Sequence, residues 1–101
     1  MTKPYKLTTA AQDDLQEIWL YIAQNNPLAA DHVEDALYDT FNILAENPHI
    51  GHTRPDIKAN NIRFWGVYSY QIIYEPKSEP LQILRILSGY RDINNILDEE
   101  L

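Results

Sequence analysis

The sequence contains no cysteine, and this absence removes several kinds of chemistry. A disulfide framework, a zinc–thiolate site and a thiol nucleophile are all excluded. The chain also lacks any apolar run close to the ~20 residues that span a bilayer. Residues 1–5 contain no apolar core of the kind that directs export. We therefore expect a cytoplasmic protein with no membrane association.

Basic residues are scarce: eight Lys and Arg stand against 15 Asp and Glu, which gives a net charge of −7. A free-standing nucleic-acid binder must neutralise several phosphates and is usually basic, so we expect no direct contact with nucleic acid. From Leu7 to Thr53 the chain has no Lys or Arg at all. The acids in that stretch are Asp13, Asp14, Glu17, Asp31, Glu34, Asp35, Asp39 and Glu46.

Most of the positive charge lies in the second half of the chain, on or beside three strand-like runs. These bases are Arg54, Lys58, Arg63, Lys77, Arg85 and Arg91. The sequence therefore divides into an acidic helical half and a sheet half that carries the cations. We expect the functional surface on the sheet.

A chain of 101 residues is long enough for one core, so we expect a single domain over residues 1–101. Residues 3–7 predict a short opening strand. Thr9 and Gln12 have capping-box spacing, and Asp13 and Asp14 favour the positive end of a helix that continues to about Gln24. Its apolar stripe consists of Ala11, Leu15, Ile18, Trp19 and Ile22.

A second helix follows immediately, with Asn26 as its cap and Pro27 at its first position. Asn47 and Pro48 end it. Its apolar stripe is formed by Ala30, Val33, Leu37, Phe41 and Leu44. Because the connection between the two helices is so short, they are predicted to form an antiparallel hairpin.

Residues 48–61 read as a loop, followed by a strand over 62–66 that alternates Ile62 and Phe64 with Arg63 and Trp65. Turns at 68–69 and 76–80 separate two further strands, and Leu81–Leu87 is apolar on both faces, typical of a strand covered on both sides. A short helix closes the chain. The sequence thus predicts an α+β fold of order β-α-α-β-β-β, with the helical hairpin packed on a small, mainly antiparallel sheet.

This order resembles that of the ParE/RelE superfamily of small bacterial toxins, and the local sequence resembles its ParE-like branch. The segments that carry the resemblance are 14–15, 18, 21–23, 26–30, 44–48, Gly51, Arg54, 62–63, Tyr70, Ile72, Tyr74, 83–87 and 89–92. The resemblance implies the toxin of a type II toxin–antitoxin system, which inhibits DNA gyrase by binding and arrests growth, as plasmid-stabilisation toxins do. It also implies a cognate antitoxin in a hetero-oligomer, with a toxin homodimer as a further assembly, and no cofactor.

RelE-like members of the superfamily resemble metal-independent, ribosome-dependent mRNA nucleases, and this activity is the main alternative. Such chemistry needs a base, cations and an acid around the scissile phosphate. Arg63 and Arg91 match two RelE-like arginines, but Leu97 occupies the position of the RelE-like tyrosine. We therefore predict no catalytic residues and no enzyme. A non-toxic relic that only binds antitoxin is the second alternative.

The predicted binding residues, for target or antitoxin, are Arg54, Arg63, Trp65, Arg85, Tyr90 and Arg91. Arg and large aromatics supply many interface hot spots. For four of them a role other than binding stays open. Arg63 is either a solvated strand residue or part of a basic face shared with Arg85 or Arg91. Arg85, in an apolar strand, is either an internal ion-pair partner or a partner contact. Arg91 either pairs with Asp92 or contacts a target, and Trp65 is equally compatible with the core. His49, His52 and Asp56 are not predicted to bind metal, because two imidazoles in a loop are weak support for a site.

Overall fold

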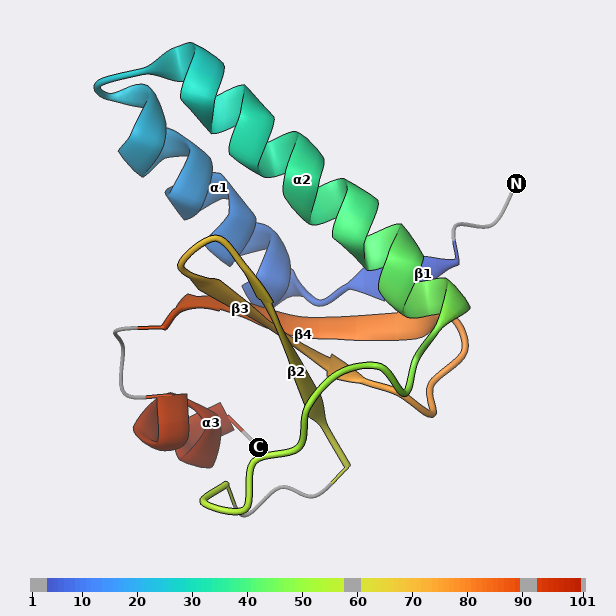
Figure 1. Ribbon diagram of the computed structural model, residues 1–101. Coiled ribbons are helices and arrows are strands. Elements are labelled where there is room, and N and C mark those ends of the chain that lie inside the picture. Colours follow the sequence, from blue (N-terminus) through green and yellow to red (C-terminus); the bar gives the residue numbers. More distant parts are fainter. Residues whose placement is uncertain (1–3, 58–60, 90–92, 101) are drawn as a thin grey trace.

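The structure, a computed structural model, describes residues 4–57, 61–89 and 93–100. Figure 1 shows the predicted order of elements with its short final helix. The elements are β1 (Tyr5–Leu7), α1 (Thr9–Ala23), α2 (Pro27–Glu46), β2 (Arg63–Val67), β3 (Tyr70–Glu75), β4 (Leu81–Ser88) and α3 (Ile93–Glu100). The predicted α+β class and the order β-α-α-β-β-β are confirmed. Lys3, at the start of the predicted first strand, lies outside the described residues.

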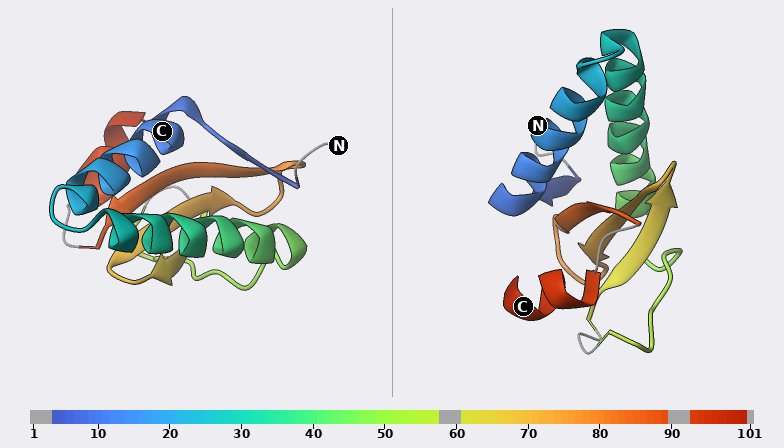
Figure 2. Two further views of the ribbon diagram at one scale, coloured as in Figure 1. Left: turned by 90° about the horizontal axis from the view of Figure 1, so that it is seen from above. Right: turned by 90° about the vertical axis from the view of Figure 1, so that its left-hand side faces the viewer.

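The four strands form one mixed sheet in the order β1-β4-β3-β2. β1 runs parallel to β4, whereas the β4–β3 and β3–β2 pairs are antiparallel. The α1–α2 hairpin lies on one face of this sheet and α3 on the other, as the right-hand view of Figure 2 shows. The prediction of a mainly antiparallel sheet under a helical hairpin is therefore confirmed.

The start of α1 differs from the prediction. The N-cap is Thr8, not Thr9: its side-chain oxygen accepts from the Ala11 N–H at 3.1 Å. The first turn of the helix therefore contains no acid. Because the helix dipole acts mainly within the first turn, Asp13 and Asp14 do not have the predicted role at the helix terminus.

The turn between the helices forms as predicted. The Asn26 side chain accepts from the Ala29 N–H at 3.0 Å, and Pro27 is the first residue of α2. A second tie lies nearby, where the half-buried Trp19 donates its indole N–H to Asp31 Oδ1 at 2.9 Å. This bond joins α1 to α2, so Trp19 has a structural role, in line with its place in the helical stripe.

Two apolar clusters lie on opposite faces of the sheet. The larger, under the helical hairpin, contains Tyr5, Ala11, Leu15, Leu37, Phe41, Leu44, Ile72, Tyr74, Leu81, Ile83 and Ile86. The smaller, under α3, contains Ile57, Ile62, Phe64, Ile73, Leu87, Ile93 and Leu97. β4 contributes to both clusters, which confirms that this strand is covered on both sides. Within the described residues, no helix is both long and apolar enough to cross a membrane.

Candidate partner-binding surface

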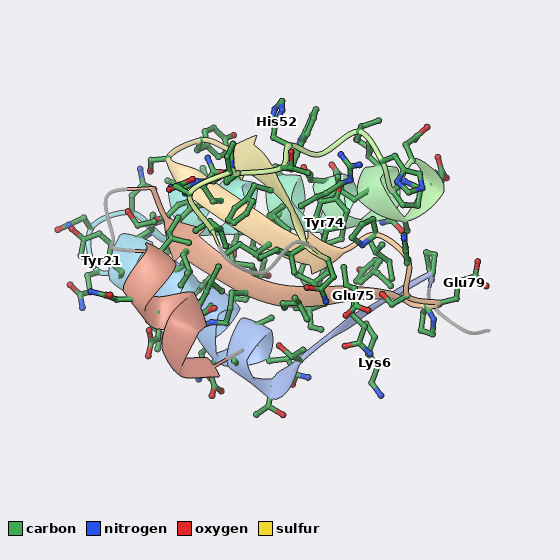
Figure 3. All side chains as sticks on the ribbon, turned by 90° about the horizontal axis from the view of Figure 1, so that it is seen from below. Lys6, Tyr21, His52, Tyr74, Glu75 and Glu79 are labelled. Atoms are coloured by element: carbon green, nitrogen blue, oxygen red, sulfur yellow. The ribbon has the colours of Figure 1, made fainter. Side chains whose placement is uncertain are left out.

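β2 forms one edge of the sheet, and the loop after α2 returns to cover part of it. His52 and Phe64 exchange two backbone hydrogen bonds, of 2.7 Å and 2.8 Å, in an isolated antiparallel bridge. The His52 ring stacks on Trp65, with ring centroids 5.7 Å apart and an interplanar angle of 12°. Figure 3 shows His52 pointing outward from this edge. The exposed imidazole and the half-buried indole thus form one flat aromatic surface.

Arg54 lies against the other side of the same edge. Its guanidinium carbon is 5.3 Å from the centre of the Phe64 ring. Its Nε and Nη2 donate to the two carboxylate oxygens of Asp56 at 3.2 Å and 2.7 Å. We call His52, Arg54, Arg63 and Trp65 the β2-edge surface, since all four lie on β2 or on the loop that pairs with it.

Arg63 and Tyr74 fix that loop. Arg63 donates through Nη1 to the Gly51 carbonyl at 2.8 Å. The Tyr74 hydroxyl donates to the Pro48 carbonyl at 2.7 Å and accepts from the Gly51 N–H at 2.9 Å. Figure 3 shows Tyr74 inside the molecule. Burial raises the pKa of this phenol, against the smaller opposing effects of the Gly51 hydrogen bond and the Arg63 charge.

Gly51 cannot be replaced at this point without moving Tyr74. A Cβ on Gly51 would lie 2.3 Å from the Tyr74 hydroxyl oxygen. The close approach of backbone and phenol explains the glycine in sterics alone.

Arg85 is an internal ion-pair partner, the first of its two predicted alternatives. Its Nε and Nη2 donate to the Asp14 carboxylate at 2.6 Å and 2.8 Å. Asp14 Oδ2 also accepts from the Ile86 N–H at 3.0 Å. Only 11% of the Arg85 side chain and 6% of the Asp14 side chain are exposed. Arg85 therefore stabilises the junction of α1 with β4 and adds little accessible surface.

The pair is located where β1 ends. β1 pairs with β4 only as far as Leu7 with Ile83, and the register between β3 and β4 shifts so that Leu84 has no partner residue. Beyond Ile83, the N-cap and first turns of α1 bond to the edge of β4. The Thr8 hydroxyl donates to the Leu84 carbonyl at 2.8 Å, and the Asp14 carboxylate accepts from the Ile86 N–H. Sequence reasoning missed the role of Asp14, which lies 71 residues from Arg85.

The predicted residues do not all come together. Arg54, Arg63 and Trp65 share the β2-edge surface, and Arg85 lies in the interior near α1. Tyr90, Arg91 and its predicted ion-pair partner Asp92 lie outside the described residues. Leu97, at the position of the RelE-like tyrosine, is 2% exposed in the cluster under α3. Among the residues that the structure describes, no group of three His, Asp or Glu side chains is arranged to hold a metal ion.

The helical hairpin offers a second surface that the sequence did not single out. An open groove of about 570 Å³ runs between α1 and the far half of β4. Asp14, Glu17, Tyr21 and Tyr70 are among its lining residues, and Tyr21 is 72% exposed. Burial raises the pKa of Tyr70, with a smaller effect from the neighbouring Tyr21. Because Asp14 is paired with Arg85, the groove presents the exposed Tyr21 beside the exposed Glu17, a combination that suits a partner with apolar and basic groups.

The fold and these two surfaces define a small α+β domain that can receive a partner at the β2 edge or along α1. A sequence model described as the ParE toxin of type II toxin–antitoxin systems, parDE, matches residues 5–93. Because this match spans most of the chain, the protein belongs to the ParE toxin family. The predicted family is thereby confirmed, and membership of this family supports the prediction that the chain is not an enzyme.

Individual relatives agree with this assignment. Toxin ParE3 of Caulobacter vibrioides is 26% identical over 83 residues, which cover 81% of this chain and 82% of the relative. A solved structure of the chromosomal ParDE system from P. aeruginosa has the same fold, with a TM-score of 0.68 at 23% identity. That similarity covers 83% of this chain and 92% of the other. The solved structure supports the fold, and the family assignment rests on the match over residues 5–93.

Proposed function

We propose that this toxin inhibits DNA gyrase in the cytoplasm by binding it, and that a cognate antitoxin prevents this. The observation that carries the proposal is the family match over residues 5–93. Gyrase passes DNA through a transient double-strand break, so a protein that traps the cleaved complex damages DNA and stops growth. The proposed contacts are Arg54, Arg63 and Trp65 on the β2-edge surface, with Tyr90 and Arg91 beyond β4. We propose that residues 1–101 act as one domain.

The antitoxin is proposed to fold on the toxin along the helical hairpin and over the sheet. Coupled folding lets a short disordered segment cover a wide surface. The stretch from Leu7 to Thr53 holds eight acids and no Lys or Arg, so the antitoxin segment should be basic. Reversing acids such as Glu34 and Asp35 to Lys should slow association more than it speeds dissociation, because long-range charge acts mainly on encounter. Equal effects on both rates, measured by stopped flow, count against this view.

The alternative of a RelE-like ribonuclease finds little support in the described residues. Leu97 is apolar and buried where the tyrosine is needed. A leucine side chain can neither donate nor accept a proton near a phosphate.

Expression of the chain alone separates the three readings. Growth arrest with broken DNA and intact messages supports gyrase inhibition. Cut messages with intact DNA would mean a ribonuclease, and normal growth with antitoxin binding would mean a relic. The neighbouring reading frame should encode a small DNA-binding antitoxin.

A further inference from the structure

A cavity that shares Arg63 with the β2-edge surface lies at the corner where β3 leaves the sheet. An open cavity of about 410 Å³ is lined there by residues from three separate segments. His49 and Thr53 come from the loop after α2. Asn61 lies just before β2, Arg63 begins that strand, and Lys77 comes from the turn after β3. The register of β2 against β3 brings these segments together. Because Arg63 is paired with Tyr74, the chain beyond β3 runs beside residues 61 and 62.

The chemistry of this corner is that of an anion site. All five of these side chains can donate hydrogen bonds, and two of them carry a permanent positive charge. No Asp or Glu is among the described residues that line the cavity. The chain has a net charge of −7, so this cavity, with cations and without described carboxylates, is a region of locally positive charge on an acidic protein.

Arg63 is held in place by the fold, and neither Arg63 nor Lys77 is neutralised by a described carboxylate. Arg63 uses Nη1 to bond the Gly51 carbonyl at 2.8 Å, which fixes the direction of its guanidinium. Tyr74 binds the backbone on both sides of His49, at Pro48 and at Gly51. Among the described residues, His49, Arg63 and Lys77 form no ion pair. Donors positioned before a ligand arrives lose less entropy on binding it.

We propose that this cavity binds a terminal phosphate group, as inorganic phosphate or at the end of a nucleotide. A tetrahedral dianion presents several acceptor oxygens and can engage an Arg, a Lys and neutral donors at once. A carboxylate has only two oxygens for the same donors. The net charge of −7 repels a long polyanion, so a compact phosphate is favoured over a nucleic-acid strand.

The carboxylate of Glu79, near the cavity, provides a control whose removal should change binding in the opposite direction. Glu79 lines an adjoining cavity together with His49 and Lys77, and Figure 3 shows it at the turn before β4. Its charge opposes the binding of an anion at Lys77. Removing that charge should strengthen binding, whereas removing Arg63 or Lys77 should weaken it.

The test is an NMR titration of the full chain at constant ionic strength, with inorganic phosphate, AMP and a short single-stranded oligonucleotide that has no terminal phosphate. We expect phosphate to shift the signals of residues 49, 53, 61, 63 and 77. Lys77→Gln and Arg63→Gln should each weaken binding about tenfold, and Glu79→Gln should strengthen it about twofold. Tighter binding of AMP than of phosphate assigns a nucleotide, and equal binding assigns free phosphate.

Lys6→Gln is the matched control, because it makes the same change of charge on β1, away from the cavity. Equal weakening by Lys6→Gln and Lys77→Gln would mean that only net charge matters and would overturn the proposal. Absence of saturable shifts, or tighter binding of the oligonucleotide than of AMP, would also overturn it. Lys77 is exposed in a turn, so its variant should fold and keep the test decisive. Phosphate binding by the chain alone does not involve gyrase, so this proposal and the proposed function fail separately.

Discussion

Arg85 and Arg63 lie on the same sheet but differ in burial and in the groups that they bond. Arg85 is held by both oxygens of a carboxylate and is almost completely buried at the junction of α1 with β4. Arg63 makes one bond to a backbone carbonyl and lines an open cavity with Lys77. A buried guanidinium needs a partner within the fold, and a partly exposed one keeps donors available for a ligand. Arg85 therefore stabilises the fold, and Arg63 is the arginine that we propose for recognition.

We expect the largest loss of stability from removing Asp14, the ion-pair partner of Arg85. Asp14→Ala leaves the Arg85 guanidinium and the Ile86 N–H without their acceptor, so we expect the free energy of unfolding to fall by about 3 kcal/mol or more. Urea denaturation followed by circular dichroism measures it. The double variant Asp14→Leu, Arg85→Met should be less destabilised than the sum of its single changes. A loss well under 1 kcal/mol for Asp14→Ala would show that the pair is not the structural element described here.

Tyr74→Phe tests how firmly the loop after α2 is held. The change removes two hydrogen bonds and leaves the Gly51 N–H and the Pro48 carbonyl without the phenol. We expect a loss of about 1–3 kcal/mol in the free energy of unfolding, because a buried donor is left unsatisfied. Amide hydrogen exchange should speed up at Gly51. Unchanged exchange and stability would contradict the proposed clamp.

The raised pKa of Tyr74 also predicts how the stability of the fold changes at alkaline pH. Burial raises the pKa of Tyr74, as it does for Tyr5 and Tyr70, above the ordinary value of 10.0. The unfolded chain therefore releases protons first as the pH rises, and the folded chain keeps them. The resulting stability is complete below pH 10 and is lost as the pH rises through the folded-state pKa values. Tyr74→Phe should flatten this alkaline decline, and denaturation midpoints across pH 8–12 would record it.

The smallest effect is expected at Arg54. Its ion pair with Asp56 is more than one-third exposed on both sides, so Arg54→Ala should change the free energy of unfolding by about 1 kcal/mol or less. Binding of the partner should respond more strongly than stability does, since Arg54 lies on the β2-edge surface. Calorimetry with the purified antitoxin measures the change in affinity, and urea denaturation measures the change in the free energy of unfolding. A large destabilisation without any change in affinity would place Arg54 with Arg85 as a structural residue.

Most of the fold followed from local signals in the sequence. Asn26 with Pro27 marked the boundary between two periodic stripes, and short turns marked the strand meander. The misses involved partners distant in sequence. Pattern alone located Arg85 in an apolar strand but could not reveal Asp14 as its partner, because only the tertiary fold brings them together. The bridge of His52 to Phe64 and the cavity at Lys77 depend on the path of a loop, which has no periodicity to read.

Purified gyrase provides the most direct test of the proposed mode of action. The folded chain, supercoiled plasmid and ATP should yield linear plasmid in proportion to the amount of toxin, and prior addition of the antitoxin should abolish it. A correctly folded chain that leaves gyrase supercoiling and plasmid integrity unaltered at saturating concentration would contradict the assignment of gyrase as the target.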